Sequence, residues 1–309
     1  MSKLVRENIA SMQGYSWGEQ PKTSRSLIKL NTNENPYPPS PNVIRALQTL
    51  DTEGLRTYPN PLADELRAEV AKLNRIADKN VVITNGGDEG LRLSLTTFVD
   101  PGETVCFADP SYSLYPVLAA IQGANIKPVA YSDGWEIPET FPEKIKSFDA
   151  KMSYLVNPHA PSGNFYSLGA LDKIAQSAPG VLLIDEAYAD FIDPSLNYQS
   201  TELLKKYDNV LILRTFSKGY SLAGIRLGYL MGNEALISPI ISKTRDSYNV
   251  GSIQQRLGTA AITDQEYSQK IWKKIRENRT HLQDRLTALG LTSNPSQSNF
   301  ILVEIDNQR

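Results

Sequence analysis

Lys218 lies in the segment TFSKGYSLAGI (residues 215–225), among serines and glycines and directly after an apolar run. A single lysine in a loop is most often a solvated surface residue. A lysine amine at the end of a strand, with few opposite charges near it in sequence, can instead be partly desolvated and act as a nucleophile that forms a Schiff base. The choice between these roles depends on which polar groups the fold brings to Lys218.

Polar residues also end two other apolar runs of the chain. Asn-Pro at 157–158 follows KMSYLV, and Asp-Glu-Ala-Tyr at 185–188 follows GVLLI. Ligands of parallel sheets bind beyond the carboxyl ends of the strands, where such groups meet. We therefore expect these two segments and the turn of Lys218 to converge on one crevice.

Pyridoxal phosphate is a ligand that needs this combination of groups. Lys218 can supply an amine for its aldehyde, and Asp185 a carboxylate that keeps the pyridine nitrogen protonated, so that the ring withdraws electrons. Tyr188 and Asn157 are suitable donors to its phenolic oxygen, and the ring of Tyr112 can cover its face.

The phosphate of such a cofactor needs an anion site, and the segment TNGGDEGLRL (residues 84–93) has a suitable composition. It is a glycine-rich turn from a strand into a helix, where free N–H groups and the helix dipole favour an anion. Thr215, Ser217 and Arg226 can add hydroxyl and guanidinium contacts.

Each of these segments also has an ordinary structural alternative. Asp185 could cap a helix, Tyr188 could be a half-buried tyrosine, and Asn157 could begin a turn. GGDEG could be a tight turn before an acidic first helical turn. All these coincidences would have to occur together, in the right chain order, and we therefore favour the shared site.

The elements that position these residues alternate between strands and helices. Helical patterns such as DEGLRLSLTTFV, and LGALDKIAQSA after Ser167 as N-cap, separate five apolar runs that are typical of buried strands. The runs cover residues 80–87, 103–109, 151–158, 180–188 and 209–217. This alternation predicts an α/β fold with a mostly parallel sheet that helices cover on both faces.

The chain divides into three predicted parts. Residues 1–35 form an N-terminal arm, residues 36–250 a large cofactor-binding domain, and residues 251–309 a smaller domain. In the smaller domain a helical pattern stops at Gly290, and SNFILVEI predicts one more strand.

The composition excludes several classes of function. The 32 lysines and arginines against 34 acidic residues leave a net charge of -2, which provides no basic surface for nucleic acid or an anionic membrane. No apolar segment resembles a signal peptide or a membrane span. The single cysteine, Cys106, predicts a buried thiol in a reducing, cytoplasmic compartment. With only His159 and His281, we expect no metal site.

Several segments together resemble a known family. NPHAPSGN, DEAYADF and RTFSKGYSLAGIRLGY resemble the signature segments of fold type I pyridoxal-phosphate aminotransferases. LNTNENPYPPSP, YPNP and NGGDEGL resemble the histidinol-phosphate aminotransferase family within that group, and the resemblance runs from about Tyr15 to about Ile305. It implies a large domain with a mostly parallel sheet and a smaller α+β domain.

The resemblance also implies roles for individual residues. Lys218 would be the Schiff-base lysine, with Asp185 at the pyridinium nitrogen. The cofactor ligands implied are Tyr188, Asn157, Tyr112, Gly87, Asp88 through its backbone, Thr215, Ser217 and Arg226. Tyr58 matches a tyrosine that reaches the cofactor phosphate from the partner subunit, and Tyr15, Asn33 and Asn157 are the implied substrate contacts.

The activity implied is transfer of an amino group from L-histidinol phosphate to 2-oxoglutarate in histidine biosynthesis. Lys218 would serve as both covalent anchor and proton shuttle, which predicts ping-pong kinetics. Because Tyr58 would complete the partner's site, the resemblance implies a homodimer.

Other functions are less well supported. An aromatic aminotransferase or a phospho-amino-acid decarboxylase of the same fold would keep the same cofactor residues. A Ser-x-x-Lys acyl enzyme is disfavoured because Thr215 stands three residues before Lys218. A nicotinamide enzyme would need a Gly-x-Gly-x-x-Gly segment after a strand, and a regulatory binding module would carry an added DNA-binding segment; the sequence has neither.

One departure from the family concerns the substrate. Members of the family usually continue past the NFILVEI strand and carry an arginine there that binds the substrate's anionic group. This sequence ends at Arg309, in IDNQR, which does not match that context. We therefore expect a shortened chain with an incomplete small domain.

Overall fold

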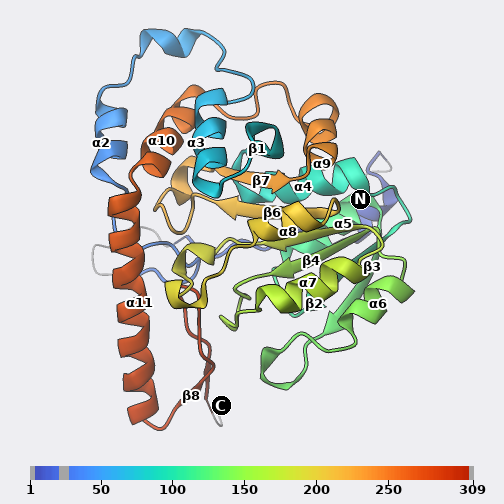
Figure 1. Ribbon diagram of the computed structural model, residues 1–309. Coiled ribbons are helices and arrows are strands. Elements are labelled where there is room, and N and C mark those ends of the chain that lie inside the picture. The colour runs from blue at the N-terminus through green and yellow to red at the C-terminus, as the bar shows by residue number, and fades with distance from the viewer. Residues whose placement is uncertain (1–3, 21–27, 306–309) are drawn as a thin grey trace.

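Helices flank a central sheet in the computed structural model, which describes residues 4–20 and 28–305 (Figure 1). The strands are β1 Val81–Thr84, β2 Thr104–Asp109, β3 Asn125–Ala130, β4 Met152–Val156, β5 Val181–Asp185, β6 Val210–Thr215, β7 Gly228–Gly232, β8 Thr292–Ser293 and β9 Val303–Glu304. The α-helices are α1 Glu7–Ser11, α2 Pro41–Gln48, α3 Asp64–Asn74, α4 Gly86–Phe98, α5 Leu114–Gln122, α6 Phe141–Ser147, α7 Leu168–Ser177, α8 Thr201–Lys206, α9 Glu234–Pro239, α10 Ser252–Thr263 and α11 Gln265–Ala288. Short 3₁₀ turns are η1 Glu53–Arg56, η2 Asp78–Asn80, η3 Asp133–Trp135, η4 Ala189–Phe191, η5 Pro194–Leu196 and η6 Ala223–Ile225, and η7 Ile240–Thr244 is a π-helical turn.

The central sheet has seven strands in the order β1-β7-β6-β5-β4-β2-β3. Strands β3, β2, β4, β5 and β6 are parallel, and β7 is antiparallel to both of its neighbours, β6 and β1. Strand β1 therefore points the same way as β6. The carboxyl ends of these six strands meet at one edge of the sheet, which is where α/β folds bind ligands.

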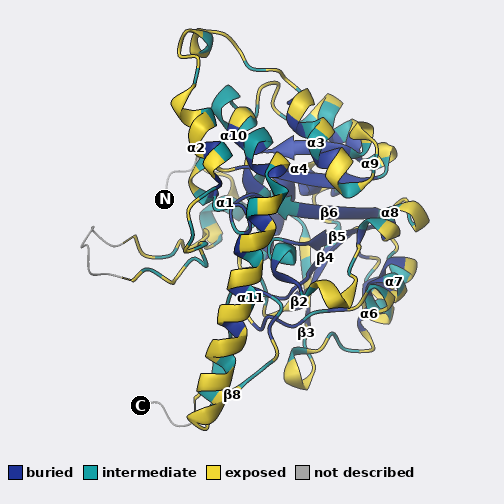
Figure 2. Ribbon diagram, turned by 60° about the vertical axis from the view of Figure 1, so that its left-hand side comes forward, coloured by how far each residue is buried: buried dark blue, intermediate teal, exposed yellow. Residues whose placement is uncertain are grey.

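Alternate side chains of the central strands fill two cores, one on each face of the sheet. In β5, Leu182 and Ile184 belong to one core, and Val181 and Leu183 belong to the other. The first core also contains side chains of α2, α3, α6, α7, α8 and α10, and the second contains side chains of α4, α5 and α9. Both faces are covered (Figure 2), so these strands appear in the sequence as continuous apolar runs.

The α/β fold with a mostly parallel sheet is confirmed, and each of the five predicted apolar runs contains a strand, namely β1, β2, β4, β5 or β6. The buried Cys106 in β2 is confirmed as well. Helix α7 follows Ser167, whose Oγ accepts a hydrogen bond from the Ala170 N–H over 3.3 Å. Helix α11 ends just before Gly290, which has a positive φ of 78°.

Three strands, β3, β7 and β8, were not predicted from the sequence, and one predicted strand was too long. Strand β3 lies at the sheet edge, where Pro128 is tolerated and where most residues are exposed, so it has no apolar run. Strand β7 is a short run between Gly228 and Gly232. Of the predicted strand SNFILVEI, only Val303–Glu304 pairs, with β8. The Phe300 carbonyl before it accepts hydrogen bonds from the Ser296 and Ser298 hydroxyls.

Candidate active site

Lys218 lies in the turn after β6, and its side chain lines a cavity of about 920 Å³. Its Nζ donates a hydrogen bond to the carbonyl oxygen of Thr32 over 2.6 Å and lies 5.8 Å from the centre of the Tyr188 ring. Burial lowers the pKa of the Lys218 amine to about 8, because exclusion of water disfavours its charged form. An amine with this pKa is partly unprotonated near neutral pH, as a nucleophile must be.

The backbone around Lys218 is held from two distant segments. Asn35 Nδ2 donates to the Lys218 carbonyl over 3.0 Å, and Trp272 Nε1 of α11 donates to the Gly219 carbonyl over 2.8 Å. Asn35 Oδ1 in turn accepts from the Tyr37 N–H over 3.0 Å. Sequence reasoning did not identify Asn35 or Trp272, although Asn35 lies in the segment NENPYPPSP that carries the family resemblance.

Asp185 is the last residue of β5, and its side chain lies on the same face of the sheet as Leu183, toward α5. Tyr115 of α5 donates its hydroxyl hydrogen to Asp185 Oδ2 over 2.8 Å, and the Ala187 N–H donates to Oδ1 over 3.0 Å. Burial nevertheless raises the pKa of the Asp185 carboxyl to about 6, because these two neutral donors only partly replace water. Tyr115 was missed in the sequence analysis.

The first turn of α4 forms one wall of the same cavity. The N-cap residue Asn85 makes no side-chain capping hydrogen bond, so the helix starts without a side-chain acceptor from that position. Gly87 and Asp88 of this turn line the cavity. Gly86 has a φ of 79°, and a Cβ there would lie 2.8 Å from Arg226 Nη2. Glycine at this position therefore allows Arg226 to lie across the start of the helix.

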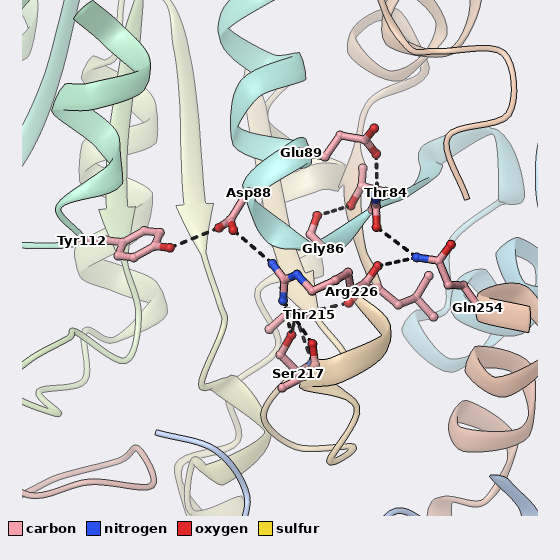
Figure 3. A network of polar contacts seen from close by, with 12 residues as sticks. Thr84, Gly86, Asp88, Glu89, Tyr112, Thr215, Ser217, Arg226 and Gln254 are labelled. Carbon is pink, nitrogen blue, oxygen red and sulfur yellow. Dashed lines mark hydrogen bonds and ion pairs between the residues drawn. The ribbon is translucent and has the colours of Figure 1, made fainter. Parts of the chain in front are cut away.

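Hydroxyl groups and a guanidinium face this turn, as the sequence predicted (Figure 3). Thr215 Oγ1 donates to Ser217 Oγ over 2.9 Å, and Arg226 Nη1 also lies 3.4 Å from Ser217 Oγ. Arg226 Nη2 forms an ion pair of 3.0 Å with Asp88 Oδ2. The sequence analysis expected only the backbone of Asp88 to take part, but its carboxylate also contacts two site residues, Arg226 and Tyr112.

Aromatic rings gather beside the first turn of α4. The Tyr112 hydroxyl donates to Asp88 Oδ1 over 3.2 Å, and burial raises the pKa of this hydroxyl well above its usual range. Tyr112 makes edge contacts with Tyr15, at 6.0 Å between ring centres, and with Tyr115, at 5.6 Å. Tyr15 and Tyr112, two predicted site residues far apart in sequence, therefore lie together.

Tyr188 and Asn33 also meet in the cavity. Asn33 Nδ2 donates to the Tyr188 hydroxyl over 3.2 Å, and burial raises the pKa of that hydroxyl to about 12. The Asn33 carbonyl accepts from Asn299 Nδ2 over 2.9 Å, and the Tyr188 ring packs against Phe300 at 4.9 Å. The segment before β9 thus supports both predicted residues.

Two predicted site residues do not line the cavity. Asn157 is fully buried, and its side-chain amide makes both of its hydrogen bonds to the backbone of Tyr166: Nδ2 donates over 3.0 Å, and Oδ1 accepts over 2.9 Å. Tyr58 is 81% exposed and stacks on Tyr248 at 4.5 Å. Contact of either residue with a cofactor stays a prediction.

Comparison with known proteins places the chain in a family. The profile of the aminotransferase class I and II family matches residues 25–308. A histidinol-phosphate aminotransferase of Geotalea daltonii is 41% identical over 297 residues, which cover 96% of this chain and 83% of the relative. Histidinol-phosphate aminotransferase 1 of Trichormus variabilis is 38% identical over 304 residues, covering 98% and 85%. The chain belongs to the histidinol-phosphate aminotransferase family.

Solved structures of aminotransferases have the same fold. The histidinol-phosphate aminotransferase of Sinorhizobium meliloti, solved in complex with pyridoxal-5'-phosphate, is 27% identical with a TM-score of 0.83, over 89% of this chain and 75% of the other. A tetra mutant of Thermus thermophilus aspartate aminotransferase is 21% identical with a TM-score of 0.82, over 98% and 84%, which supports the fold alone. The predicted fold type I architecture is thereby confirmed.

The residues of this family member fit pyridoxal phosphate. The start of α4, Arg226 and the hydroxyls of Thr215 and Ser217 form a donor set for a phosphate. In residues 4–20 and 28–305, no lysine, arginine or histidine lies within ion-pair distance of the buried Asp185. A protonated pyridine nitrogen would supply the positive charge that complements this carboxylate. The volume of about 920 Å³ lies within the range of ligand cavities.

Two further findings concern metals and membranes. In the part of the chain that the structure describes, no three His, Cys, Asp or Glu side chains are grouped so that they could hold a metal ion. None of the helices within the described ranges is both long enough and apolar enough to cross a membrane.

Proposed function

We propose that this chain is a pyridoxal-phosphate-dependent aminotransferase that converts L-histidinol phosphate and 2-oxoglutarate into imidazole-acetol phosphate and L-glutamate. The observation that carries the chemistry is the single cavity shared by the Lys218 amine, the buried Asp185 carboxylate and the anion site of Arg226. The names of relatives about 40% identical over nearly the whole chain support the substrate. The reaction is a step of histidine biosynthesis.

The cofactor would be held by residues of five segments. The α4 amides of Gly87 and Asp88, with Ser217 and Arg226, would bind the phosphate. When bound, the cofactor supplies an aldehyde that carries the amino group between substrates and a ring that withdraws electrons from the reacting carbon. Tyr112 would cover the ring, and the Tyr188 hydroxyl and Asn157 would donate to its phenolic oxygen.

Lys218 is the residue that would carry the proton taken from the substrate carbon. Its Nζ would anchor the cofactor, and as a free amine it would be the base of the site. With a pKa of about 8, the free Nζ can take a proton from the substrate carbon and return it to a neighbouring carbon. The Thr32 carbonyl, 2.6 Å from Nζ, gives the freed amine a fixed partner and limits where it can move.

Asp185 provides the charge that the electron-withdrawing ring requires. Its pKa of about 6 means that the carboxyl is mostly ionised above that pH, even without a cationic partner. A pyridinium nitrogen would favour the ionised form further, since opposite charges stabilise each other in a site that excludes water. Tyr115 fixes the Asp185 carboxylate through Oδ2.

The N-terminal arm forms the substrate side of the site. Tyr15 and Asn33 line the cavity together with Trp17 and Phe300. The lining arginines of the described chain are Arg214, paired with Glu186 at 2.7 Å, and Arg226, paired with Asp88. We assign Tyr15 and Asn33 to the substrate, with Asn157 as the third residue that the family implies.

The proposal includes a homodimer in which Tyr58 of each subunit completes the partner's phosphate site. Its support is the exposure of Tyr58, 81%, in a segment fixed by the Tyr248 stack and by Gln255 Nε2, which donates to the Asn60 carbonyl over 2.8 Å. A large aromatic side chain exposed on a structured loop is suited to contact a second subunit.

Domain organisation and location complete the proposal. Residues 1–35 act as the arm, residues 36–250 as the cofactor domain, and residues 251–309 as part of a smaller domain. A cytoplasmic location is favoured by the single, fully buried Cys106, which needs no oxidising compartment, and by the biosynthetic reaction.

Steady-state kinetics test the substrate assignment. The purified protein is assayed with 2-oxoglutarate as acceptor and with L-histidinol phosphate, L-phenylalanine or L-aspartate as donor. The proposal predicts parallel double-reciprocal lines and the highest kcat/KM with histidinol phosphate. A higher kcat/KM with phenylalanine would assign an aromatic aminotransferase, and release of carbon dioxide from a phospho-amino acid would assign a decarboxylase.

A further inference from the structure

Arg226, which reaches into the phosphate site, has an unusual backbone conformation. Its φ of 53° and ψ of 72° lie in the left-handed region, which a side chain with a Cβ adopts at a cost unless the surroundings fix it. From this backbone position the guanidinium reaches Ser217 Oγ at 3.4 Å and Asp88 Oδ2 at 3.0 Å. A contact that holds the Arg226 backbone therefore also holds the base of this side chain.

Gln254, in the first turn of α10, holds that backbone. Its Nε2 lies 2.8 Å from the Ile225 carbonyl and 2.9 Å from the Arg226 carbonyl, and it also lies 3.0 Å from Asn85 Oδ1 at the start of α4 (Figure 3). The two N–H groups of the amide are therefore shared among three oxygens. Gln254 Oε1 accepts from the Gly251 N–H over 2.7 Å, which fixes the orientation of the amide.

A second side-chain contact ties the same segment to α4. Asn249 Nδ2 donates to Glu89 Oε2 over 2.7 Å, and the same carboxylate oxygen accepts from the Asn85 N–H over 2.6 Å. The stretch 249–254 thus hydrogen-bonds the first turn of α4 at Asn85 and Glu89. Within the described residues, its side-chain hydrogen bonds to the Arg226 turn come from the Gln254 amide. Besides the Arg226–Asp88 ion pair, the Gln254 amide hydrogen-bonds both halves of the anion site.

We propose that Gln254 is a positioning residue for the phosphate of the cofactor. It keeps the Arg226 turn and the start of α4 at the separation that allows guanidinium and helix amides to bind one anion. The inference rests on the proposed function, since it concerns the same cofactor. It assigns to Gln254 a role that acts through Arg226 and Asn85, without contact between Gln254 and the ligand.

The role predicts an effect that depends on the phosphate. Loss of the amide frees the Arg226 turn to relax from its left-handed conformation, which moves the guanidinium but leaves Lys218 and Asp185 in place. Pyridoxal lacks the phosphate, so its binding does not depend on the anion site. The ratio of the two affinities therefore separates positioning of the anion site from a general loss of structure.

Two variants of the full-length protein test the proposal. Gln254→Met removes the amide without adding charge, and Gln254→Glu keeps the acceptor for Gly251 but removes the N–H groups. Binding of pyridoxal phosphate and of pyridoxal is titrated through the visible band that either compound gives when it bonds to a lysine. Both variants should weaken the binding of pyridoxal phosphate about tenfold more than the binding of pyridoxal, as expected for loss of a partly buried hydrogen bond.

Gln122→Glu is the matched control. Gln122 Nε2 donates to the Val99 carbonyl over 2.7 Å at the far end of α4, so this variant makes the same chemical change away from the anion site. It should leave the affinity ratio unchanged. The positioning role would be overturned if Gln254→Met weakened the binding of both compounds equally. It would also be overturned if only Gln254→Glu changed the affinity ratio. If wild-type protein gives no band with either compound, the proposed function itself fails.

Discussion

The hydroxyl of Tyr115 donates a hydrogen bond of 2.8 Å to Asp185 Oδ2, the carboxylate at the end of β5. The Tyr115 ring is fully buried and stacks on Tyr154 at 4.7 Å with an interplanar angle of 8°. A rigid donor therefore fixes the carboxylate that we assign to the pyridine nitrogen.

Tyr115→Phe should weaken cofactor binding by about tenfold, because it removes a hydrogen bond to a buried charged group. It should also raise the pKa of Asp185 above 6, since the Tyr115 bond opposes the effect of burial. The acid limb of the pH profile of kcat/KM should shift upward. Tyr154→Phe is the matched control, since this ring is equally buried and stacks on Tyr115. An unchanged profile in Tyr115→Phe would contradict the assigned role.

Asp185→Asn should abolish transamination but stabilise the cofactor-free protein at pH 7. The folded protein retains the Asp185 proton up to a pKa of about 6, whereas an unfolded aspartate releases it near pH 4. Stability associated with the protonated form is present below about pH 4 and is lost as the pH rises through 6. Removing the charge should therefore add about 3 kcal/mol to the free energy of unfolding at pH 7. Urea titrations at pH 4 and pH 7 measure the difference in free energy of unfolding between Asp185→Asn and the wild type. An equal gain at both pH values would contradict this explanation.

Lys218→Ala should lower transamination by at least about a thousandfold, because it removes both the anchor and the proton carrier. The fold should persist, with an unchanged far-ultraviolet circular dichroism spectrum, and cofactor can still bind noncovalently. Lys173→Ala, at an exposed position of α7, is the control and should keep wild-type activity. Wild-type turnover by Lys218→Ala would remove this residue from the mechanism.

Mixed dimers test whether Tyr58 acts across a subunit boundary. Tyr58→Ala and Lys218→Ala should each give dimers with little activity. If Tyr58 completes the partner's site, a mixed dimer has one site with both changes and one intact site. Refolding an equal mixture should then restore about a quarter of wild-type activity, because half of the dimers are mixed. No recovery, together with mixed dimers on a sizing column, would place Tyr58 within its own subunit's site.

The fold was predictable because its central strands are covered on both faces. Continuous apolar runs such as GVLLID contain a buried strand, and polar residues at their ends, Asp185 and Lys218 among them, do lie in one cavity. Edge strand β3 was not predictable in this way, since exposure of its side chains removes the apolar pattern.

Residues whose contribution depends on tertiary contacts were missed. Tyr115 lies in an apolar helix sequence, and only the packing of α5 on β5 brings its hydroxyl to Asp185. Thr32 contacts Lys218 through its backbone carbonyl, which leaves no side-chain signal. The contact of Asn157 with a cofactor stays a prediction. The sequence did not indicate that its side-chain amide bonds to the backbone of Tyr166, nine residues away.

The visible absorption spectrum of the purified protein, before and after addition of L-histidinol phosphate, tests the central claim most directly. The account predicts a band from pyridoxal phosphate bonded to Lys218 that histidinol phosphate bleaches at a lower concentration than L-phenylalanine or L-glutamate. A band that Lys218→Ala retains would contradict the assignment of Lys218 as the lysine bonded to the cofactor. A band that responds chiefly to phenylalanine would contradict histidinol phosphate as the substrate. Failure to obtain any band with added cofactor would contradict the account as a whole.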